Sequence, residues 1–256
     1  MTIQRGLYNI HDLVATSEEE TAVRDAKKLI HDAFLAVQKL APAGAILGVL
    51  VDEQFGADVT CQAVADGVSL SVVVEASGRV DFDFEYKAAF GVHIEIFSPN
   101  YVKALVRYNP RGTAELNQLQ LKRIGQLRDW LESRPVGLLL EVVVPATSEQ
   151  LEELGGDVDR YESELRPTLM VEALEQFKVA NVTPAFWKLE GLDSSAEYQK
   201  AVDVVQDDVD NGGGFLVLGR AATDDVVEGW LTAAAPVKGY KGFAIGRSAS
   251  VFAAQL

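Results

Sequence analysis

A repeating pattern constrains the fold more than any other feature of this sequence: short, almost wholly apolar runs alternate with longer stretches that carry one apolar face. The run from Ala45 to Val51 is nearly all apolar, as expected for a strand whose two faces are both covered. Residues 17–40 place apolar side chains three or four positions apart, which predicts an amphipathic helix. The alternation therefore predicts an α/β fold of parallel strands joined by helices. We expect eight strands, at residues 7–10, 45–51, 68–74, 101–108, 137–144, 185–191, 215–218 and 240–245.

The number of repeats and the length of the chain favour one closed barrel. Eight strands with intervening helices in 256 residues match a single (β/α)8 TIM barrel. No linker or low-complexity tract divides the chain. The glycines at 212–214 are too few for a domain linker and lie where a helix is expected to end. We therefore predict one TIM-barrel domain over residues 1–256. Strict alternation at residues 80–86 predicts a small strand insertion, a hairpin or edge strand, after strand 3.

Composition excludes several classes of function. The formal net charge of −15 repels polyanions, so we expect neither a nucleic-acid partner nor a membrane partner, although a local basic cluster could hold a small phosphate. One cysteine and three histidines leave no internal disulfide and little material for a zinc site. No secretion signal and no bilayer-spanning apolar stretch is evident. We expect a soluble, cytoplasmic protein that uses no metal and no cofactor.

The predicted strand at residues 185–191 carries an ammonium and a carboxylate, Lys188 and Glu190, two positions apart. Pleating places both side chains on one face of the strand, roughly 7 Å apart. Desolvation and cationic neighbours lower the pKa of a lysine, and the neutral amine can then attack a carbonyl to form a Schiff base. We hypothesise that Lys188 does this. The alternatives are a structural ion pair of Lys188 with Glu190, or a Lys188 that only binds an anion.

Two other predicted strands carry charges toward the same interior. In residues 101–108 the alternation places Lys103 and Arg107 on the face opposite the helices, so both cations are expected to enter the barrel. Residues 137–144 are almost wholly apolar except for Glu141. A carboxylate inside such a strand must be paired or neutral, because an isolated buried charge is too costly. The sequence thus predicts cations and carboxylates together inside the barrel.

The last two predicted strands both end in Gly-Arg, at Gly219-Arg220 and Gly246-Arg247. In a TIM barrel the chemistry lies at the C-terminal strand ends, and phosphate often binds in the loops after strands seven and eight. Glycine permits close backbone approach, exposed amides favour an anion, and arginine adds a charged fork. We therefore predict a phosphate site here, with an ordinary surface salt bridge as the alternative for each arginine.

Several segments together resemble a known family: residues 51–56, 102–103 with 105–110, 141–146, 187–193, 217–220 and 242–247. The strings WKLEGLD at 187–193 and GFAIGR at 242–247 are the most specific. The segments resemble the aldolase-like domain fused to, or beside, the 5-dehydro-2-deoxygluconokinase of inositol catabolism. They are more distantly similar to the tagatose-1,6-bisphosphate aldolases, which are class I Schiff-base barrels. The resemblance, over about residues 45–247, implies Lys188 as the Schiff-base lysine, Glu141 as its proton-transfer partner, Lys103 as a cation near the reacting carbonyl, and Arg247 as a phosphate ligand.

Two positions depart from that family. It usually has an Asp-His-Arg-like run at the end of strand one, where this chain has residues 9–13 with Asp12 as the possible substitute. After strand three it commonly has Glu-Lys-Ser-Gly, whereas this chain has Ala76 in place of the lysine. These changes suggest either a different sugar phosphate or a barrel that binds a ligand without turning it over.

The sequence therefore predicts a metal-independent class I aldolase that acts on a phosphorylated keto sugar and assembles as a homo-oligomer. The resemblance implies 2-deoxy-5-keto-gluconate 6-phosphate, or a relative, as the substrate, and dihydroxyacetone phosphate and an aldehyde as products. Glu190, Arg107 and the two Gly-Arg pairs are the predicted substrate ligands. One alternative is a metal-assisted lyase or isomerase, in which Asp52, Glu53 and Glu75 would gather around an ion. The other is a non-catalytic barrel that binds sugar phosphates.

Overall fold

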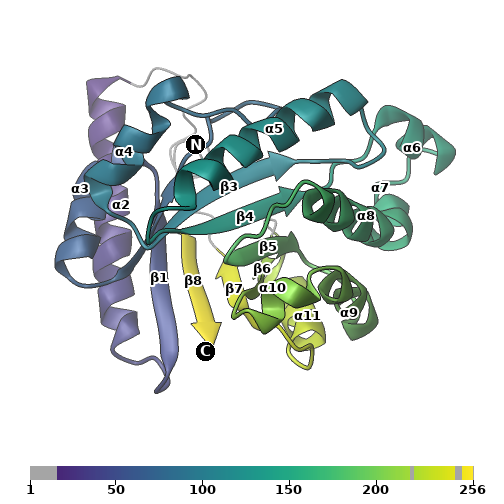
Figure 1. Ribbon diagram of the computed structural model, residues 1–256. Coiled ribbons are helices and arrows are strands. Elements are labelled where there is room, and N and C mark those ends of the chain that lie inside the picture. Colours follow the sequence, from purple (N-terminus) through teal and green to yellow (C-terminus); the bar gives the residue numbers. More distant parts are fainter. Residues whose placement is uncertain (1–15, 220–221, 246–249, 256) are drawn as a thin grey trace.

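The computed structural model describes residues 16–219, 222–245 and 250–255, and its strands form a closed barrel in chain order (Figure 1). Neighbouring strands from β1 to β7 are parallel, whereas β8 is antiparallel to both β7 and β1. The strands are β1 Ala45–Val51, β2 Ser69–Val73, β3 Tyr101–Arg107, β4 Gly137–Val143, β5 Phe186–Glu190, β6 Gly214–Leu218, β7 Tyr240–Ile245 and β8 Ser250–Gln255.

Seven of the eight predicted strands are confirmed within one or two residues at each end, as β1 to β7. The strand predicted at residues 7–10 lies outside the described residues. In an all-parallel barrel, the strand predicted at residues 7–10 would lie between β7 and β1. Here β8 lies in that position. Only residues 246–249 connect β7 to β8, and so short a connection cannot contain the crossover helix that a parallel strand needs. The prediction of eight parallel strands was therefore wrong at this position.

Helices cover the outside of the barrel (Figure 1). Those flanking the β1 side of the sheet are α2, α3 and α4, and α5 and α8 cover β3 and β4. The helices are α2 Ser17–Gln38, α3 Glu53–Ala65, α4 Phe90–Phe97, α5 Ala114–Leu131, α6 Ser148–Glu153, α7 Val158–Arg160, α8 Arg166–Val179, α9 Ser195–Val204, α10 Gln206–Asp210 and α11 Asp224–Ala234. None of the helices in the described part of the chain is long and apolar enough to cross a membrane.

Helix starts follow from side-chain caps. Ser194 and Glu197 form a capping box that opens α9. At α2 the capping box is formed by Thr16 and Glu19. The Asp52 carboxylate accepts a hydrogen bond from the Phe55 amide and caps α3. Only Asp52 therefore separates β1 from α3.

The predicted strand insertion at residues 80–86 is a loop rather than a strand. It makes a single isolated bridge, between Glu75 and Phe84, and no ladder. The alternation that suggested a strand is real as a burial pattern, because Phe82 and Phe84 are 2% and 5% exposed. The Phe82 amide donates to the Gln120 side chain of α5, and pairing with the segment after β2 is limited to the Glu85 amide with the Val74 carbonyl and the Ala76 amide with the Asp83 carbonyl.

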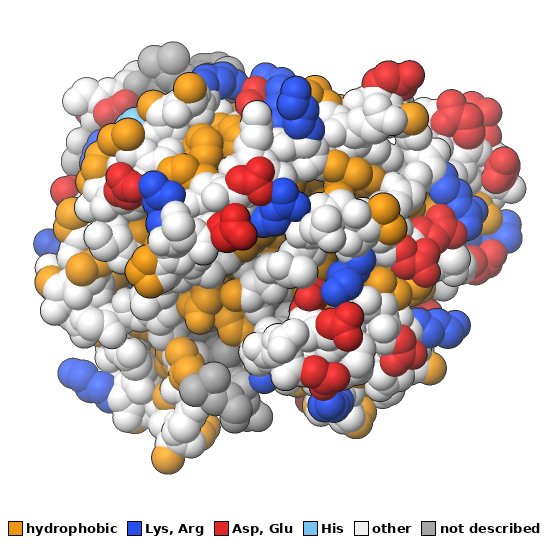
Figure 2. Space-filling model, viewed as in Figure 1, with side chains coloured by type: hydrophobic (Ala, Val, Ile, Leu, Met, Phe, Trp, Pro, Cys, Tyr) orange, Lys and Arg blue, Asp and Glu red, His pale blue; other side chains and the backbone are white. Residues whose placement is uncertain are grey.

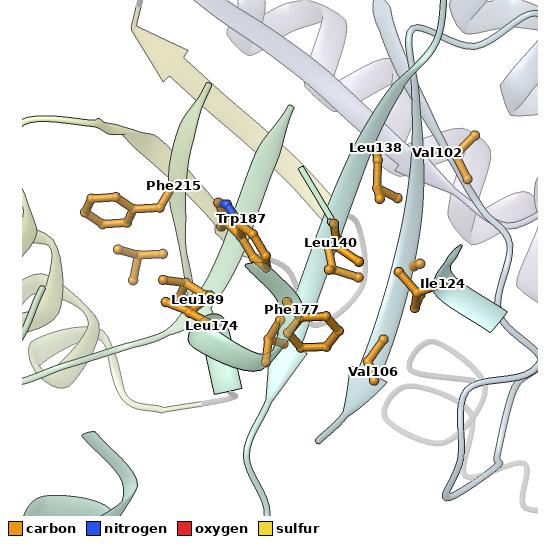
Figure 3. Packing of buried hydrophobic residues seen from close by; sticks show 14 of the residues in the cluster. Val102, Val106, Ile124, Leu138, Leu140, Leu174, Phe177, Trp187, Leu189 and Phe215 are labelled. Carbon is orange, nitrogen blue, oxygen red and sulfur yellow. The ribbon is translucent and has the colours of Figure 1, made fainter. Parts of the chain in front are cut away.

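The strands use their alternation to separate two sets of side chains, and Figure 3 shows part of the set that packs against the helices. The outward set packs against Ile124 of α5 and Leu174 and Phe177 of α8; it includes Val102, Val106, Leu138, Leu140, Trp187, Leu189 and Phe215. The opposite set includes a second, smaller cluster of Leu139, Phe186, Leu216 and Ala244, and Tyr101 packs against this cluster. These residues face the barrel interior, because they alternate with the outward set. The small cluster forms an apolar layer inside the barrel, toward the N-terminal ends of β3, β4 and β5.

Candidate functional site

Four charged side chains form a row across consecutive strands directly above the apolar layer. Lys103, Glu141 and Lys188 each follow an apolar-layer residue of their own strand by two positions, so they share its interior face. Lys103 Nζ lies 2.5 Å from Glu75 Oε1 and 2.8 Å from Glu141 Oε2. Lys188 Nζ lies 3.2 Å from the same Glu141 oxygen. The row therefore runs Glu75, Lys103, Glu141, Lys188.

Strand register brings the row together. Glu141 of β4 pairs in register with Lys188 of β5 and with Leu105 of β3, two residues beyond Lys103. Glu75 lies two residues after the end of β2, and its Oε2 accepts a hydrogen bond from the Leu105 amide at 3.3 Å. The four side chains are only 5–14% exposed. Each charge is therefore compensated mainly by its neighbours in the row rather than by water.

The electrostatics of the row give Lys188 the property that a Schiff-base lysine needs. Burial lowers the pKa of Lys188; the Glu141 carboxylate opposes this effect and the Lys103 cation adds to it. Burial alone would raise the pKa of Glu141, but Lys103 and Lys188 outweigh burial and hold that pKa at about 2. Glu141 is therefore an ionised carboxylate beside an amine that loses its proton more readily than an ordinary lysine.

The other two members of the row are shifted in a different sense. Burial raises the pKa of Glu75, and the nearby Glu141 charge adds to that rise while Lys103 opposes it. Burial would lower the pKa of Lys103, but Glu141 and Glu75 outweigh burial and raise it. Lys103 therefore holds a proton more firmly than an ordinary lysine, and Glu75 holds a proton more readily than an ordinary glutamate.

Glu190 lies on the same strand face as Lys188, as predicted, and is completely buried at the end of β5. Its Oε2 accepts a hydrogen bond from the Val144 amide at 2.8 Å. The Tyr161 hydroxyl donates to the Val144 carbonyl at 2.8 Å, so the end of β4 is fixed from two sides. The ion pair of Lys188 is with Glu141 of the next strand. Of the two carboxylates near Lys188 in the sequence prediction, Glu141 is the one in direct contact.

The predicted phosphate ligands are only partly within the described residues. Arg107 lies at the exposed C-terminal end of β3 and donates through Nη1 to the Arg79 carbonyl at 3.2 Å. Gly219 is buried just after β6, and its carbonyl accepts from the Ala222 amide at 2.9 Å. Arg220, Gly246 and Arg247 lie outside the described residues, so the phosphate cradle stays a prediction.

Residues 7–255 match the family model described as an uncharacterized protein conserved in bacteria, DUF2090. The match spans nearly the whole chain. The chain belongs to the DUF2090 family. No curated protein matches its sequence.

Solved structures resemble the fold of this DUF2090 member. Cgl0159 from Corynebacterium glutamicum aligns with a TM-score of 0.56 and 15% identity, over 90% of this chain and 68% of the other. A fructose-bisphosphate aldolase from Slackia heliotrinireducens aligns with a TM-score of 0.54 and 12% identity, over 78% and 60%. An archaeal fructose-1,6-bisphosphate aldolase, whose catalytic lysine is covalently bound to a carbinolamine intermediate, aligns with a TM-score of 0.51 and 11% identity, over 78% and 70%. These similarities show an aldolase-like barrel fold.

Sequence reasoning missed Glu75 as a member of the interior row. Alternation offered a signal, because Glu75 continues the series of alternate residues Ser71 and Val73 and is therefore expected on the same face. Ser71 and Val73 pair in register with Tyr101 and Lys103. Glu75 was instead considered as a metal ligand together with Asp52 and Glu53. In this DUF2090 member those carboxylates are separated: Asp52 pairs with Lys27, Glu53 with His93, and Glu75 with Lys103.

The metal-assisted alternative therefore has no ligand cluster within the described ranges. No group of three His, Cys, Asp or Glu side chains there is arranged to hold a metal ion. A pocket lies at the opposite end of the barrel, where Gly137 begins β4 and Ala185 precedes β5. It contains none of the predicted site residues.

Proposed function

We propose that this protein is an aldolase-type lyase that cleaves a phosphorylated keto sugar through a Schiff base on Lys188, without a metal ion. The observation that carries the proposal is the contact of a buried lysine of lowered pKa with an ionised carboxylate, Glu141, at 3.2 Å. A nucleophilic amine with an adjacent base is the arrangement that imine chemistry requires.

The first half of the reaction forms the imine. The neutral Nζ of Lys188 attacks the substrate ketone, and Glu141 accepts the proton that the nitrogen gives up. Glu141 passes that proton to the alkoxide oxygen formed in the attack, which gives a hydroxyl group. The proton that Lys188 released when it became neutral then reaches this hydroxyl group, so one water leaves and an iminium remains. Lys103, which stays protonated 2.8 Å from Glu141, supplies a fixed positive charge beside the oxygen that becomes negative during the attack.

The second half breaks the carbon–carbon bond. A base removes the proton of the hydroxyl group on the carbon that becomes the aldehyde, and the bonding electrons move into the iminium to give an enamine. A proton returns to the enamine carbon, and one water hydrolyses the new iminium, which releases the second product and restores Lys188. The water lost in the first half is thus consumed in the second, and the net reaction is cleavage of one ketose phosphate into two carbonyl compounds.

The substrate class rests on the family resemblance and on the two Gly-Arg strand ends. The proposed substrate is 2-deoxy-5-keto-gluconate 6-phosphate or a close relative, with dihydroxyacetone phosphate and an aldehyde as products. Gly219-Arg220 and Gly246-Arg247 are the proposed phosphate ligands. Two of the neighbouring structures are aldolases, and one carries its intermediate on a lysine, which supports the same chemistry here.

The test is borohydride trapping with a panel of ketose phosphates, read by intact mass and peptide mapping. The correct ketose phosphate is expected to add its mass irreversibly at Lys188, because borohydride reduces the iminium. Lys188→Met is expected to abolish both labelling and turnover. The matched control is Lys178→Met: Lys178 lies on the outer helix α8 and pairs with Asp208, so its loss should leave labelling unchanged.

A second candidate function is favoured by one observation, the alanine at position 76 where the resembling family has a lysine. The Ala76 amide donates to the Asp83 carbonyl, so this position belongs to the loop above the row. A barrel without that lysine could bind a sugar phosphate and not cleave it. Tight binding of a ketose phosphate in calorimetry, with no lysine labelled and no product formed, would establish this alternative and end the aldolase proposal.

A further inference from the structure

The row of four charged residues can be electrically neutral in two different protonation states. With both lysines protonated and both glutamates ionised, the row has no net charge. It also has no net charge when Lys188 is a neutral amine and Glu75 is a neutral acid, while Lys103 and Glu141 keep their charges. These two states contain the same number of protons. A buried site can therefore pass between them without creating an uncompensated charge.

We propose that Glu75 is a positioning residue for the Schiff-base reaction, which acts through Lys103 and Glu141 by taking up the proton that Lys188 must lose. The inference rests on the proposed function, in which the neutral amine is the nucleophile. Glu75 does not touch the substrate in this assignment. It determines how readily the row supplies a neutral Lys188.

The contacts provide a route for the proton. Lys188 donates to Glu141 Oε2 across 3.2 Å, and Lys103 donates to Glu75 Oε1 across 2.5 Å. Glu141 then passes its proton to the Lys103 amine across 2.8 Å. The sum of these transfers leaves a neutral Lys188, an ionised Glu141, a protonated Lys103 and a neutral Glu75. No proton enters from solvent and no charge is left over.

The surroundings of the row keep the exchange internal. The charged groups that face Lys188 within the described residues are Glu141 from β4, Lys103 from β3 with Glu75 behind it, and Glu190 from its own strand. The neighbouring strands β6 and β7 contribute the apolar Leu216 and Ala244, and Tyr101 and Phe186 lie below. The row is largely shielded from water and lies on an apolar layer. Glu75 is therefore the carboxyl group that is connected to Lys188 through Lys103 and Glu141.

The directions of the four pKa shifts agree with this assignment. The inner pair is held charged, because the pKa of Lys103 is raised and that of Glu141 is lowered to about 2. The outer pair is shifted toward its neutral forms, because burial lowers the pKa of Lys188 and raises that of Glu75. The ends of the row are thus the two groups that change protonation together.

The proposal is tested by an NMR titration that needs no sugar phosphate. The protein is labelled with [13C]lysine, the Lys188 resonance is assigned by its loss in Lys188→Met, and the Cε shift is followed against pH. Glu75→Gln removes the charge of Glu75 permanently, so the Lys188 midpoint is expected to fall by about one pH unit. The matched control is Glu53→Gln, which removes a carboxylate paired with His93 outside the row and should leave the midpoint unchanged.

An unchanged or higher Lys188 midpoint in a folded Glu75→Gln protein overturns the proposal. If Glu75→Gln does not fold, the wild-type protein carrying [13C]glutamate as well decides the matter. Shared transitions of Glu75 Cδ and Lys188 Cε support the proposal, and two independent single transitions overturn it. A shift of the midpoint without any borohydride labelling by ketose phosphates would contradict the aldolase function alone, because the titration depends only on the row.

Discussion

Acid should remove a defined part of the stability of this protein through Glu141. Lys103 and Lys188 hold the pKa of this carboxyl at about 2, against a reference value of 4.5. A folded-state pKa below the unfolded value contributes stability above the unfolded pKa, and that contribution is lost as pH falls through the folded pKa. The difference of about 2.5 pH units, at about 1.4 kcal/mol per unit, corresponds to about 3 kcal/mol at neutral pH. About 2 kcal/mol of this should be lost between pH 6 and pH 3.

The assay is urea unfolding of the wild-type protein and Glu141→Gln at several pH values from 6 to 3. The glutamine cannot ionise, so the variant is expected to be less stable at pH 6, and the difference in unfolding free energy should shrink by about 2 kcal/mol by pH 3. The matched control is Glu164→Gln, which breaks an exposed pair with Arg160. Its curve should remain close to that of the wild-type protein, because solvent screens exposed pairs.

Parallel curves for the wild-type protein and Glu141→Gln would refute this reasoning. A constant difference would mean that Glu141 does not titrate between its unfolded value and about 2, and hence that the two lysines do not hold it ionised. A difference that grows toward low pH would reverse the sign and point to a carboxyl group that folds in its protonated form.

Two predictions concern activity and binding. Glu141→Gln should leave substrate binding intact and slow turnover by about 10²–10⁴-fold in single-turnover kinetics, because proton transfer is lost; unchanged turnover would assign that role to Glu190. Arg247→Ala should weaken binding of a phosphorylated ligand by about 1.5–3 kcal/mol and barely affect its unphosphorylated analogue in calorimetry; equal losses for both ligands would reject the phosphate site.

The repeat in the sequence was enough to predict β1 to β7, because buried parallel strands are nearly all apolar and differ clearly from amphipathic helices. It was not enough for residues 80–86, where alternating burial was mistaken for strand pairing. Periodicity reports which side chains are buried, and a loop packed on α5 can produce the same pattern as an edge strand. Helix α4 was missed for a related reason, since its Phe, Val and Ile content favours a strand by propensity.

The interior positions of Lys103, Glu141 and Lys188 could be predicted because alternation along one strand fixes the face of each side chain. Their mutual contacts could not, since the stagger between neighbouring strands decides which charges meet. Register placed Lys188 against Glu141 of β4, whereas spacing along β5 had suggested Glu190 as well. Glu75 was considered only under the metal-assisted alternative, because its partner Lys103 lies 28 residues away in the chain.

The antiparallel strand β8 also has a consequence for how the barrel is completed. In the pairing of β1 with β2, Ser69 lies 21 residues after Gly48, whereas in the pairing of β1 with β8, Ser250 lies 200 residues after Leu50. Loop-closure entropy makes the second pairing costlier by about 2 kcal/mol, before any other strand has ordered the chain. The β1–β8 junction is therefore expected to form last during folding and to open first. Amide protons of β1 that bond to β8 should exchange with deuterium sooner than those that bond to β2.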